Sequence, residues 1–156
     1  MRISELDISD AIKDLLSSRG FDELYPPQAE AIKAGVLEGK SLVMASPTAS
    51  GKTLVAELCA FKHILEQGGK VLYLVPLRAL ASEKYEDFQT YSSLTKQDGN
   101  KIRVGVSTGD LDSRKSWLGD YDIVVTTNEK CDSLLRHRSP WMEDVSLVIV
   151  DEVHLI

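Results

Sequence analysis

The chain has 156 residues, of which 43% are hydrophobic and 27% are charged, and its net charge is −6. This length suits one domain with one hydrophobic core, and the negative charge gives no overall basic surface, so any nucleic-acid contact has to be local. Cys59 and Cys131 stand alone and form neither a zinc pattern nor a disulfide framework, and the N-terminus is polar. We therefore expect a cytoplasmic protein without a signal peptide or a membrane partner.

Short apolar segments alternate with segments of helical periodicity along the chain. The predicted strands are residues 41–45, 70–75, 101–106, 122–127 and 146–151. Most of them are apolar on both faces, as strands in a parallel sheet covered on both sides are. The predicted helices are residues 7–20, 27–39, 52–69, 78–91 and 128–138, the last with Asn128 as its N-cap. This alternation predicts a doubly wound α/β layer.

Residues 46–53, SPTASGKT, lie between a predicted strand and a predicted helix. This is the context that a phosphate-binding loop requires. Gly51 allows close approach of the backbone to phosphate, Lys52 would reach the β- and γ-phosphates, and Thr53 would supply a hydroxyl to Mg²⁺. Ser46 stands where the usual pattern has its first glycine, but it is small enough to leave this chemistry possible. The alternative, a chance G-K-T at a helix start, does not explain the preceding strand.

An acidic pair follows the last predicted strand, in the sequence VIVDEVH. A carboxylate at the carboxyl end of a strand can hold Mg²⁺, and a neighbouring carboxylate can orient and deprotonate an attacking water. We assign Asp151 to the metal and Glu152 to the base, with His154 placed to sense the γ-phosphate. Such a pair is weak on its own, because acidic residues are common in turns, but it gains weight from the phosphate loop about a hundred residues upstream.

The segments PTASGKT and DEVH together resemble those of the superfamily 2 DExH-box helicases. Four further stretches resemble the Q motif, motif Ia and the following nucleic-acid-contacting segments, including motif Ib: ELYPPQAEAI, VPLRALASEKYEDF, STGD and TTNEKCDSLL. Together these motifs are most similar to those of the archaeal DNA repair helicases of the superkiller type. The resemblance runs from Leu24 to His154, and the combination is far more specific than any one motif.

This resemblance implies a RecA-like fold, with a mostly parallel sheet and helices on both faces. Residues 1–39 would be a helical lead-in with the Q motif, and residues 40–156 would form the core from the phosphate loop to DEVH. The implied cofactors are ATP and Mg²⁺, and the implied catalytic residues are Lys52, Asp151 and Glu152, with Thr53 and Asp151 at the metal. The residues implied to bind ATP are Gln28, Ser46, Pro47, Thr48, Ala49, Ser50, Gly51, Lys52 and Thr53.

The resemblance also implies a partner, single-stranded or forked DNA, moved 3′ to 5′ by cycles of ATP hydrolysis. The residues in the matching nucleic-acid segments are Pro76, Arg78, Thr108, Gly109, Thr127 and Glu129. The residues themselves do not decide between DNA and RNA. Protein contacts with a single-strand backbone are alike for the two nucleic acids unless a residue contacts the 2′-hydroxyl of RNA. The role of Gln28 in contacting adenine depends most on the resemblance, since the residue would otherwise be interpreted as a surface glutamine early in a helix.

The sequence departs from the family pattern at Ala49, where many helicases have glycine, and at its C-terminus. The family continues with a Ser-Ala-Thr motif, the rest of the first domain and a second RecA-like domain with an arginine finger. The strand before the Ser-Ala-Thr motif lies between the phosphate-loop strand and the Asp-Glu strand. We therefore expect a fold that is incomplete at the C-terminus, lacks a central strand, is unstable alone and unwinds no duplex.

Two other functions remain open at this point. A different P-loop enzyme, such as a small-molecule kinase, would share the phosphate loop but would not explain PPQAEAI before it or TTNEK after the fourth predicted strand. A non-catalytic nucleotide-binding or interaction module would fit a chain that lacks parts needed for hydrolysis.

Overall fold

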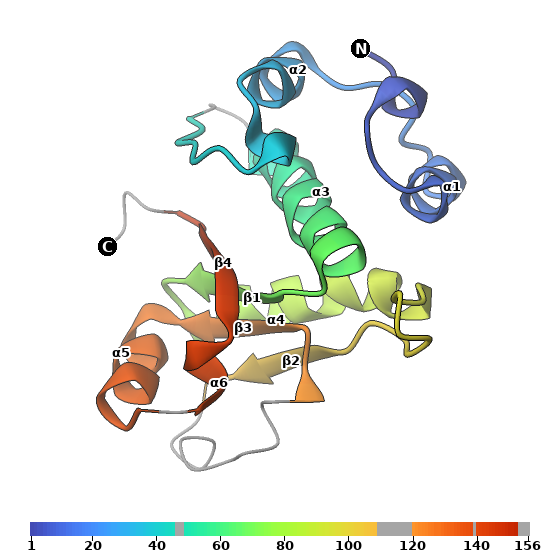
Figure 1. The fold of residues 1–156 in the computed structure, drawn as a ribbon. Coiled ribbons are helices and arrows are strands. Elements are labelled where there is room, and N and C mark those ends of the chain that lie inside the picture. Colours follow the sequence, from blue (N-terminus) through green and yellow to red (C-terminus); the bar gives the residue numbers. More distant parts are fainter. Residues whose placement is uncertain (46–48, 109–119, 139, 153–156) are drawn as a thin grey trace.

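The computed structural model describes residues 1–45, 49–108, 120–138 and 140–152, with the side chains of residues 49 and 50 excepted. Four strands form one sheet: β1 (Lys70–Val75), β2 (Val104–Ser107), β3 (Ile123–Thr127) and β4 (Val145–Val150). Their spatial order is β2-β3-β1-β4, and every neighbouring pair is parallel (Figure 1). The predicted parallel α/β layer is confirmed. Of the five predicted strands, four form, with ends shifted by up to three residues.

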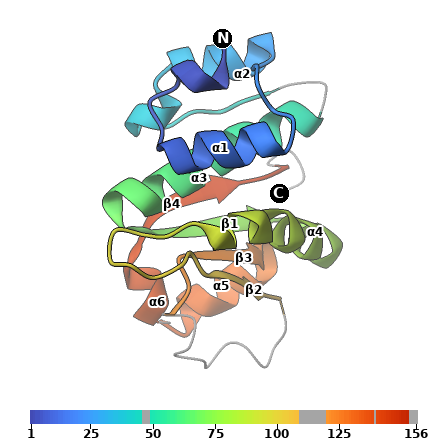
Figure 2. The same ribbon diagram turned by 90° about the vertical axis from the view of Figure 1, so that its right-hand side faces the viewer.

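The helices of the described residues are α1 (Asp10–Ser18), α2 (Pro26–Lys33), α3 (Ala49–Gln67), α4 (Arg78–Phe88), α5 (Asn128–Arg136) and α6 (Pro140–Glu143). Three short 3₁₀ turns accompany them: η1 (Ile3–Glu5), η2 (Val36–Glu38) and η3 (Gln89–Ser93). One face of the sheet packs against α3 and α4, and the other packs against α5 and α6. In Figure 2, α1 and α2 lie on the outer side of α3.

Successive residues of β1 point to opposite faces of the sheet, so one strand serves both cores. Val71, Tyr73 and Val75 contact the larger core, which includes Phe61 of α3 and Phe88 of α4. The neighbouring Leu72 belongs to the smaller core under α5 and α6. In the centre of the sheet β3 is buried at every position, which explains its uninterrupted apolar and hydroxyl sequence.

The predicted helices at 7–20, 52–69, 78–91 and 128–138 form with ends shifted by up to three residues. Two further predictions about the helices were wrong. The predicted helix at 27–39 is broken at Gly35, which has φ 98° and separates α2 from η2. Glycine adopts this left-handed conformation without the steric cost that other residues meet, so the helix ends there. The predicted N-cap of α5 was Asn128, but the hydroxyl of Thr127 accepts the hydrogen bond from Lys130 N at 3.2 Å. A capping side chain has to precede the first helical residue, and α5 already begins at Asn128.

The strand predicted at 41–45 does not form, because these residues have no strand partner in the described sheet. Val43 is 85% exposed and Leu42 is 40% exposed. A cavity of about 600 Å³ separates this segment from β4, and both the segment and β4 line it. An extended segment becomes a strand only where another strand supplies its backbone hydrogen bonds, and here the cavity lies between the two.

Candidate nucleotide and nucleic-acid sites

Gln28 fixes the start of α3. Its side-chain Nε2 donates a hydrogen bond to the carbonyl oxygen of Gly51 at 3.1 Å, and its Oε1 accepts one from the backbone N of Tyr25 at 2.7 Å. Gln28 is only 3% exposed, so the interpretation as a surface glutamine is wrong. The two bonds join α2 to the first turn of α3. A contact between Gln28 and adenine stays a prediction.

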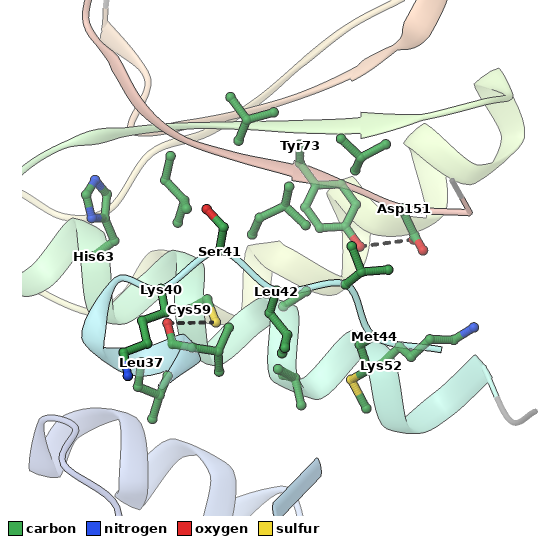
Figure 3. A pocket seen from close by; sticks show the side chains of 18 of the residues that line it. Leu37, Lys40, Ser41, Leu42, Met44, Lys52, Cys59, His63, Tyr73 and Asp151 are labelled. Carbon is green, nitrogen blue, oxygen red and sulfur yellow. Dashed lines mark hydrogen bonds between the residues drawn. The ribbon is translucent and has the colours of Figure 1, made fainter. Parts of the chain in front are cut away.

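Thr53 and Asp151, the two residues predicted to hold a metal ion, approach the same ammonium group. Lys84 of α4 donates a hydrogen bond from Nζ to Thr53 Oγ1 at 2.9 Å, and the same Nζ lies 3.9 Å from Asp151 Oδ2. The hydroxyl of Tyr73 donates to the same oxygen, Asp151 Oδ2, at 3.0 Å (Figure 3). Burial and the charge of Asp151 raise the pKa of Tyr73, so this hydroxyl keeps its proton. The fold thus brings α3, α4, β1 and the end of β4 to one point.

The acidic pair lies at the turn that follows β4. The backbone N of Asp151 donates to the carbonyl oxygen of Leu74 at 2.9 Å, which continues the pairing of β4 with β1. The next backbone N, that of Glu152, donates to Asp151 Oδ1 at 2.9 Å. Glu152 has φ 51°, a left-handed conformation that is uncommon for a residue other than glycine. Such backbone conformations cluster at functional sites.

Lys52 lines the same large cavity as Asp151 and Glu152. Figure 3 shows that side chains from the loop before α3, from α3 itself, from β1 and from β4 face this cavity. The three predicted catalytic residues are therefore brought together at one cavity, although they lie about a hundred residues apart in the chain. Glu57, one turn beyond Thr53 on α3, is also buried, and its Oε2 accepts a hydrogen bond from the Tyr91 hydroxyl at 2.7 Å.

A second cavity of about 290 Å³ gathers the residues predicted to contact nucleic acid. The predicted residues that line it are Pro76, Arg78, Thr108, Thr127 and Glu129. They lie at or just after the carboxyl ends of three neighbouring strands, β1, β2 and β3, and the carboxyl ends of parallel strands share one edge of a sheet.

Sequence reasoning missed three residues that also line this second cavity: Leu77, Lys130 and Ser133. The signal for Lys130 and Ser133 was their spacing on α5, because residues three or four positions apart lie on one helix face. Two buried polar atoms near this cavity, Ser107 Oγ and Asn128 Oδ1, have no hydrogen-bond partner among the described residues. Each is adjacent in sequence to a residue that lines the cavity, Thr108 or Thr127.

A family model described as DEAD/DEAH box helicase matches residues 25–156. The chain belongs to the DEAD/DEAH box helicase family. Membership of this family implies that the domain uses ATP. The resemblance inferred from the motifs is thereby confirmed at the level of the family.

Two similar curated proteins come from archaea. The ATP-dependent DNA helicase Hel308 of Thermococcus kodakarensis is 56% identical over 156 residues, which are 100% of this chain and 13% of that protein. Hel308 of Pyrococcus abyssi is 52% identical over 156 residues, 100% of this chain and 21% of the relative. This helicase-family chain thus spans about a fifth or less of the length of these relatives.

Solved helicase structures share the fold. The crystal structure of the DUF1998 helicase MrfA bound to DNA and AMPPNP has a TM-score of 0.76 and 31% identity, and the match covers 94% of this chain and 21% of that one. A second structure of MrfA has a TM-score of 0.77 and 32% identity, covering 95% of this chain and 24% of that one. The predicted RecA-like fold is confirmed by this likeness.

Several predicted site residues of this helicase domain lie outside the described residues: Ser46, Pro47, Thr48, Gly109 and His154, together with the side chains of Ala49 and Ser50. Within the described ranges, no group of three or more His, Cys, Asp or Glu side chains is arranged to hold a metal ion. In the same part of the chain, no helix is long and apolar enough to cross a membrane.

Proposed function

We propose that this domain binds and hydrolyses ATP with Mg²⁺ at the junction of α3 and β4. The observation that carries the proposal is the convergence of Thr53 and Asp151 on the single ammonium of Lys84, beside Lys52 and Glu152. A hydroxyl and a carboxylate from two distant segments already face one cation there. Mg²⁺ prefers such oxygen ligands, and it is usually held by one or two protein oxygens together with substrate phosphates and water.

Each proposed residue has a role that follows from its position. Gly51 and the first turn of α3 present backbone N–H groups and the positive end of the helix dipole to the phosphates. Lys52 supplies a further positive charge beside them. When bound, Mg²⁺ would neutralise charge on the phosphate oxygens. Glu152 orients the attacking water and accepts its proton, while Asp151, fixed by Tyr73, stays in the metal position.

We also propose that the second cavity contacts a nucleic-acid backbone. Arg78, Thr108 and Thr127 line it, the amino end of α5 adjoins it, and phosphates are held by such hydroxyls, helix N-termini and arginines. The names of the relatives, DNA helicases, favour single-stranded or forked DNA as the partner, moved by ATP hydrolysis in the complete protein.

We propose that residues 1–156 correspond to the first part of the first RecA-like domain, with residues 1–39 as the helical lead-in and residues 40–156 as the core. The 600 Å³ cavity between residues 41–45 and β4 has the position that the resemblance gives to a further strand. Val148 and Val150 of β4 are 52% and 39% exposed, so the edge strand offers apolar surface to such a neighbour. A second RecA-like domain would then complete the ATP site.

The thermal melt of the chain, with and without Mg-ATP, tests the nucleotide site. A ligand that binds only the folded state adds about 2.7 kcal/mol of stability at a hundredfold excess over its dissociation constant. We expect Mg-ATP to raise Tm for the parent chain and not for Lys52→Ala. An equal rise in both proteins would mean that ATP binds elsewhere, and no rise in a cooperatively melting parent would contradict the site.

A small-molecule kinase, which would need the same phosphate loop, is disfavoured as the alternative because the chain belongs to the DEAD/DEAH box helicase family. A kinase function would not explain why the residues predicted to contact nucleic acid line one cavity at the ends of β1, β2 and β3. ATPase activity stimulated by single-stranded DNA in the complete protein would support the helicase motor. A phosphorylated small-molecule product would support the kinase.

A further inference from the structure

Lys84 is buried to a degree that is rare for lysine. It is 7% exposed, and lysines are almost never fully buried unless their charge is paired. Its position in the sequence, in the middle of α4, gives no reason for this burial. The reason is in the contacts of its ammonium, which lie on other elements: Thr53 of α3 and Asp151 after β4.

The two contacts of this ammonium are the two groups proposed to hold Mg²⁺. Thr53 Oγ1 accepts the Lys84 hydrogen bond at 2.9 Å, and Asp151 Oδ2 lies 3.9 Å from the same Nζ. A carboxylate and a hydroxyl held close together in a partly buried place need a positive charge to balance them. In this structure Lys84 provides that charge.

An ammonium and a divalent cation cannot share these two oxygens without strong repulsion. Two positive charges about 4 Å apart repel by about 4 kcal/mol per unit charge pair at the effective dielectric constant of a protein surface. Metal binding therefore has to displace the Lys84 ammonium from Thr53. Glu57 lies four residues beyond Thr53 on the same face of α3, and it is the nearest further carboxylate on that helix.

The positive charge of Lys84 already affects the pKa of Glu57. Burial raises the pKa of the Glu57 carboxyl, and the positive charges of Arg19 and Lys84, together with the Tyr91 hydrogen bond, oppose that rise. Arg19 Nη1 lies 3.6 Å from Glu57 Oε2. A displaced Lys84 ammonium thus has a buried carboxylate within the same charge network to approach.

We propose that Lys84 is a positioning residue that acts as the built-in cation of this metal site. Without metal, its ammonium holds Thr53 Oγ1 and the Asp151 carboxylate together, and it competes with Mg²⁺ for them. The proposal rests on the proposed ATP and Mg²⁺ site and goes beyond it, because Lys84 belongs to neither the phosphate loop nor the acidic pair. It makes the affinity for the metal lower than the two oxygens alone would give.

The test is the Mg²⁺ dependence of binding of a fluorescent ADP analogue. We expect Lys84→Met, which keeps most of the side-chain volume but no charge, to lower the Mg²⁺ concentration at half-maximal binding about tenfold, the factor that corresponds to 1.4 kcal/mol. Lys84→Gln should shift the midpoint in the same direction. A merely structural role would weaken binding at all Mg²⁺ concentrations and would not move the midpoint downward.

Lys96→Met is the matched control. Lys96 also pairs with a buried carboxylate, that of Asp122 at 2.9 Å, but it contacts none of the proposed metal ligands. Its removal should leave the Mg²⁺ midpoint unchanged. If the parent chain binds the analogue and the Mg²⁺ midpoint of Lys84→Met is unchanged or higher, the proposed role of Lys84 is wrong. The proposed nucleotide site is not affected by that result. A parent chain that binds no analogue at any Mg²⁺ concentration would overturn the proposed nucleotide site and this proposal together.

A second measurement needs no substitution at Lys84, and so it stands if those variants fail to fold. In the parent chain labelled with ¹⁵N at the lysine Nζ atoms, a buried, hydrogen-bonded ammonium should give a slowly exchanging NMR signal in the presence of EDTA. We expect Mg-ADP to shift or abolish this signal, and ADP with EDTA to leave it in place. A Lys84 signal that does not respond to Mg²⁺ would contradict the displacement.

Discussion

The hydroxyl of Tyr73, in the middle of β1, donates a hydrogen bond to Oδ2 of Asp151, just beyond the end of β4, at 3.0 Å. The residue is 1% exposed, so its hydroxyl has no access to bulk water as an alternative partner. The ring packs edge-on against Phe88 with centroids 5.0 Å apart, which fixes the direction of the hydroxyl. The orientation of the proposed metal carboxylate is therefore set by the hydrophobic core beneath it.

Tyr73→Phe should destabilise the chain by about 1–2 kcal/mol, because it removes a hydrogen bond to a charged group and leaves the ring packing intact. The measurement is urea denaturation followed by circular dichroism. Tyr85→Phe is the matched control, since the Tyr85 hydroxyl has no hydrogen bond to the described part of the chain. Equal losses in the two variants would mean that the contact with Asp151 contributes nothing to stability.

Glu57 should make the stability of the chain depend on pH. Burial raises its pKa above 4.5 in the folded chain, so the folded state binds the proton more tightly than the unfolded state does. The stability that protonation contributes is present below pH 4.5 and is lost as pH rises through the raised folded pKa. Glu57→Gln imitates the protonated form, so its stability relative to the parent should increase across this window.

Thermal melts of parent and Glu57→Gln over a series of pH values measure this difference. The same substitution at Glu66, a more exposed carboxylate on α3, serves as the control. A difference between the parent and Glu57→Gln that stays constant with pH would show that burial does not perturb this carboxyl. If the stability of Glu57→Gln relative to the parent falls as pH rises, the pKa of Glu57 is lowered in the folded chain and not raised. The Arg19 ion pair would then outweigh the effect of burial on this pKa.

Arg78→Ala should weaken binding of single-stranded DNA and reduce its salt dependence. Removing one positive charge that neutralises a phosphate of a single strand reduces the steepness of log K against log salt by about 0.7. Fluorescence anisotropy of a labelled oligonucleotide at several salt concentrations measures both quantities. Arg136→Ala is the control, because Arg136 lies at the other end of α5, is exposed, and pairs with Asp132 at 2.9 Å. Equal changes in the two variants would indicate a diffuse electrostatic attraction and not binding at the cavity.

The elements of the sheet were largely predictable from the sequence, and the exceptions have physical causes. β1 forms at the predicted residues 70–75. Its apolar run is typical of a strand in a parallel sheet that is buried on both faces. The segment 41–45 is also mostly apolar but is not a strand here. Composition reports what a segment can bury, whereas strand formation also needs a neighbouring backbone at hydrogen-bonding distance.

For the site, the sequence by itself determined the types of residue and their order: Gly51, Lys52 and Thr53 at the start of one helix, and the acidic pair after one strand. Local motifs carry this information because a phosphate loop is a contiguous stretch of chain. The burial of Gln28 against the Gly51 carbonyl and the gathering of three strand ends at one cavity were decided by the tertiary structure. Only packing in three dimensions brings a middle residue of α4, Lys84, between Thr53 and Asp151, because no periodicity within a helix specifies which distant oxygens its side chain will meet.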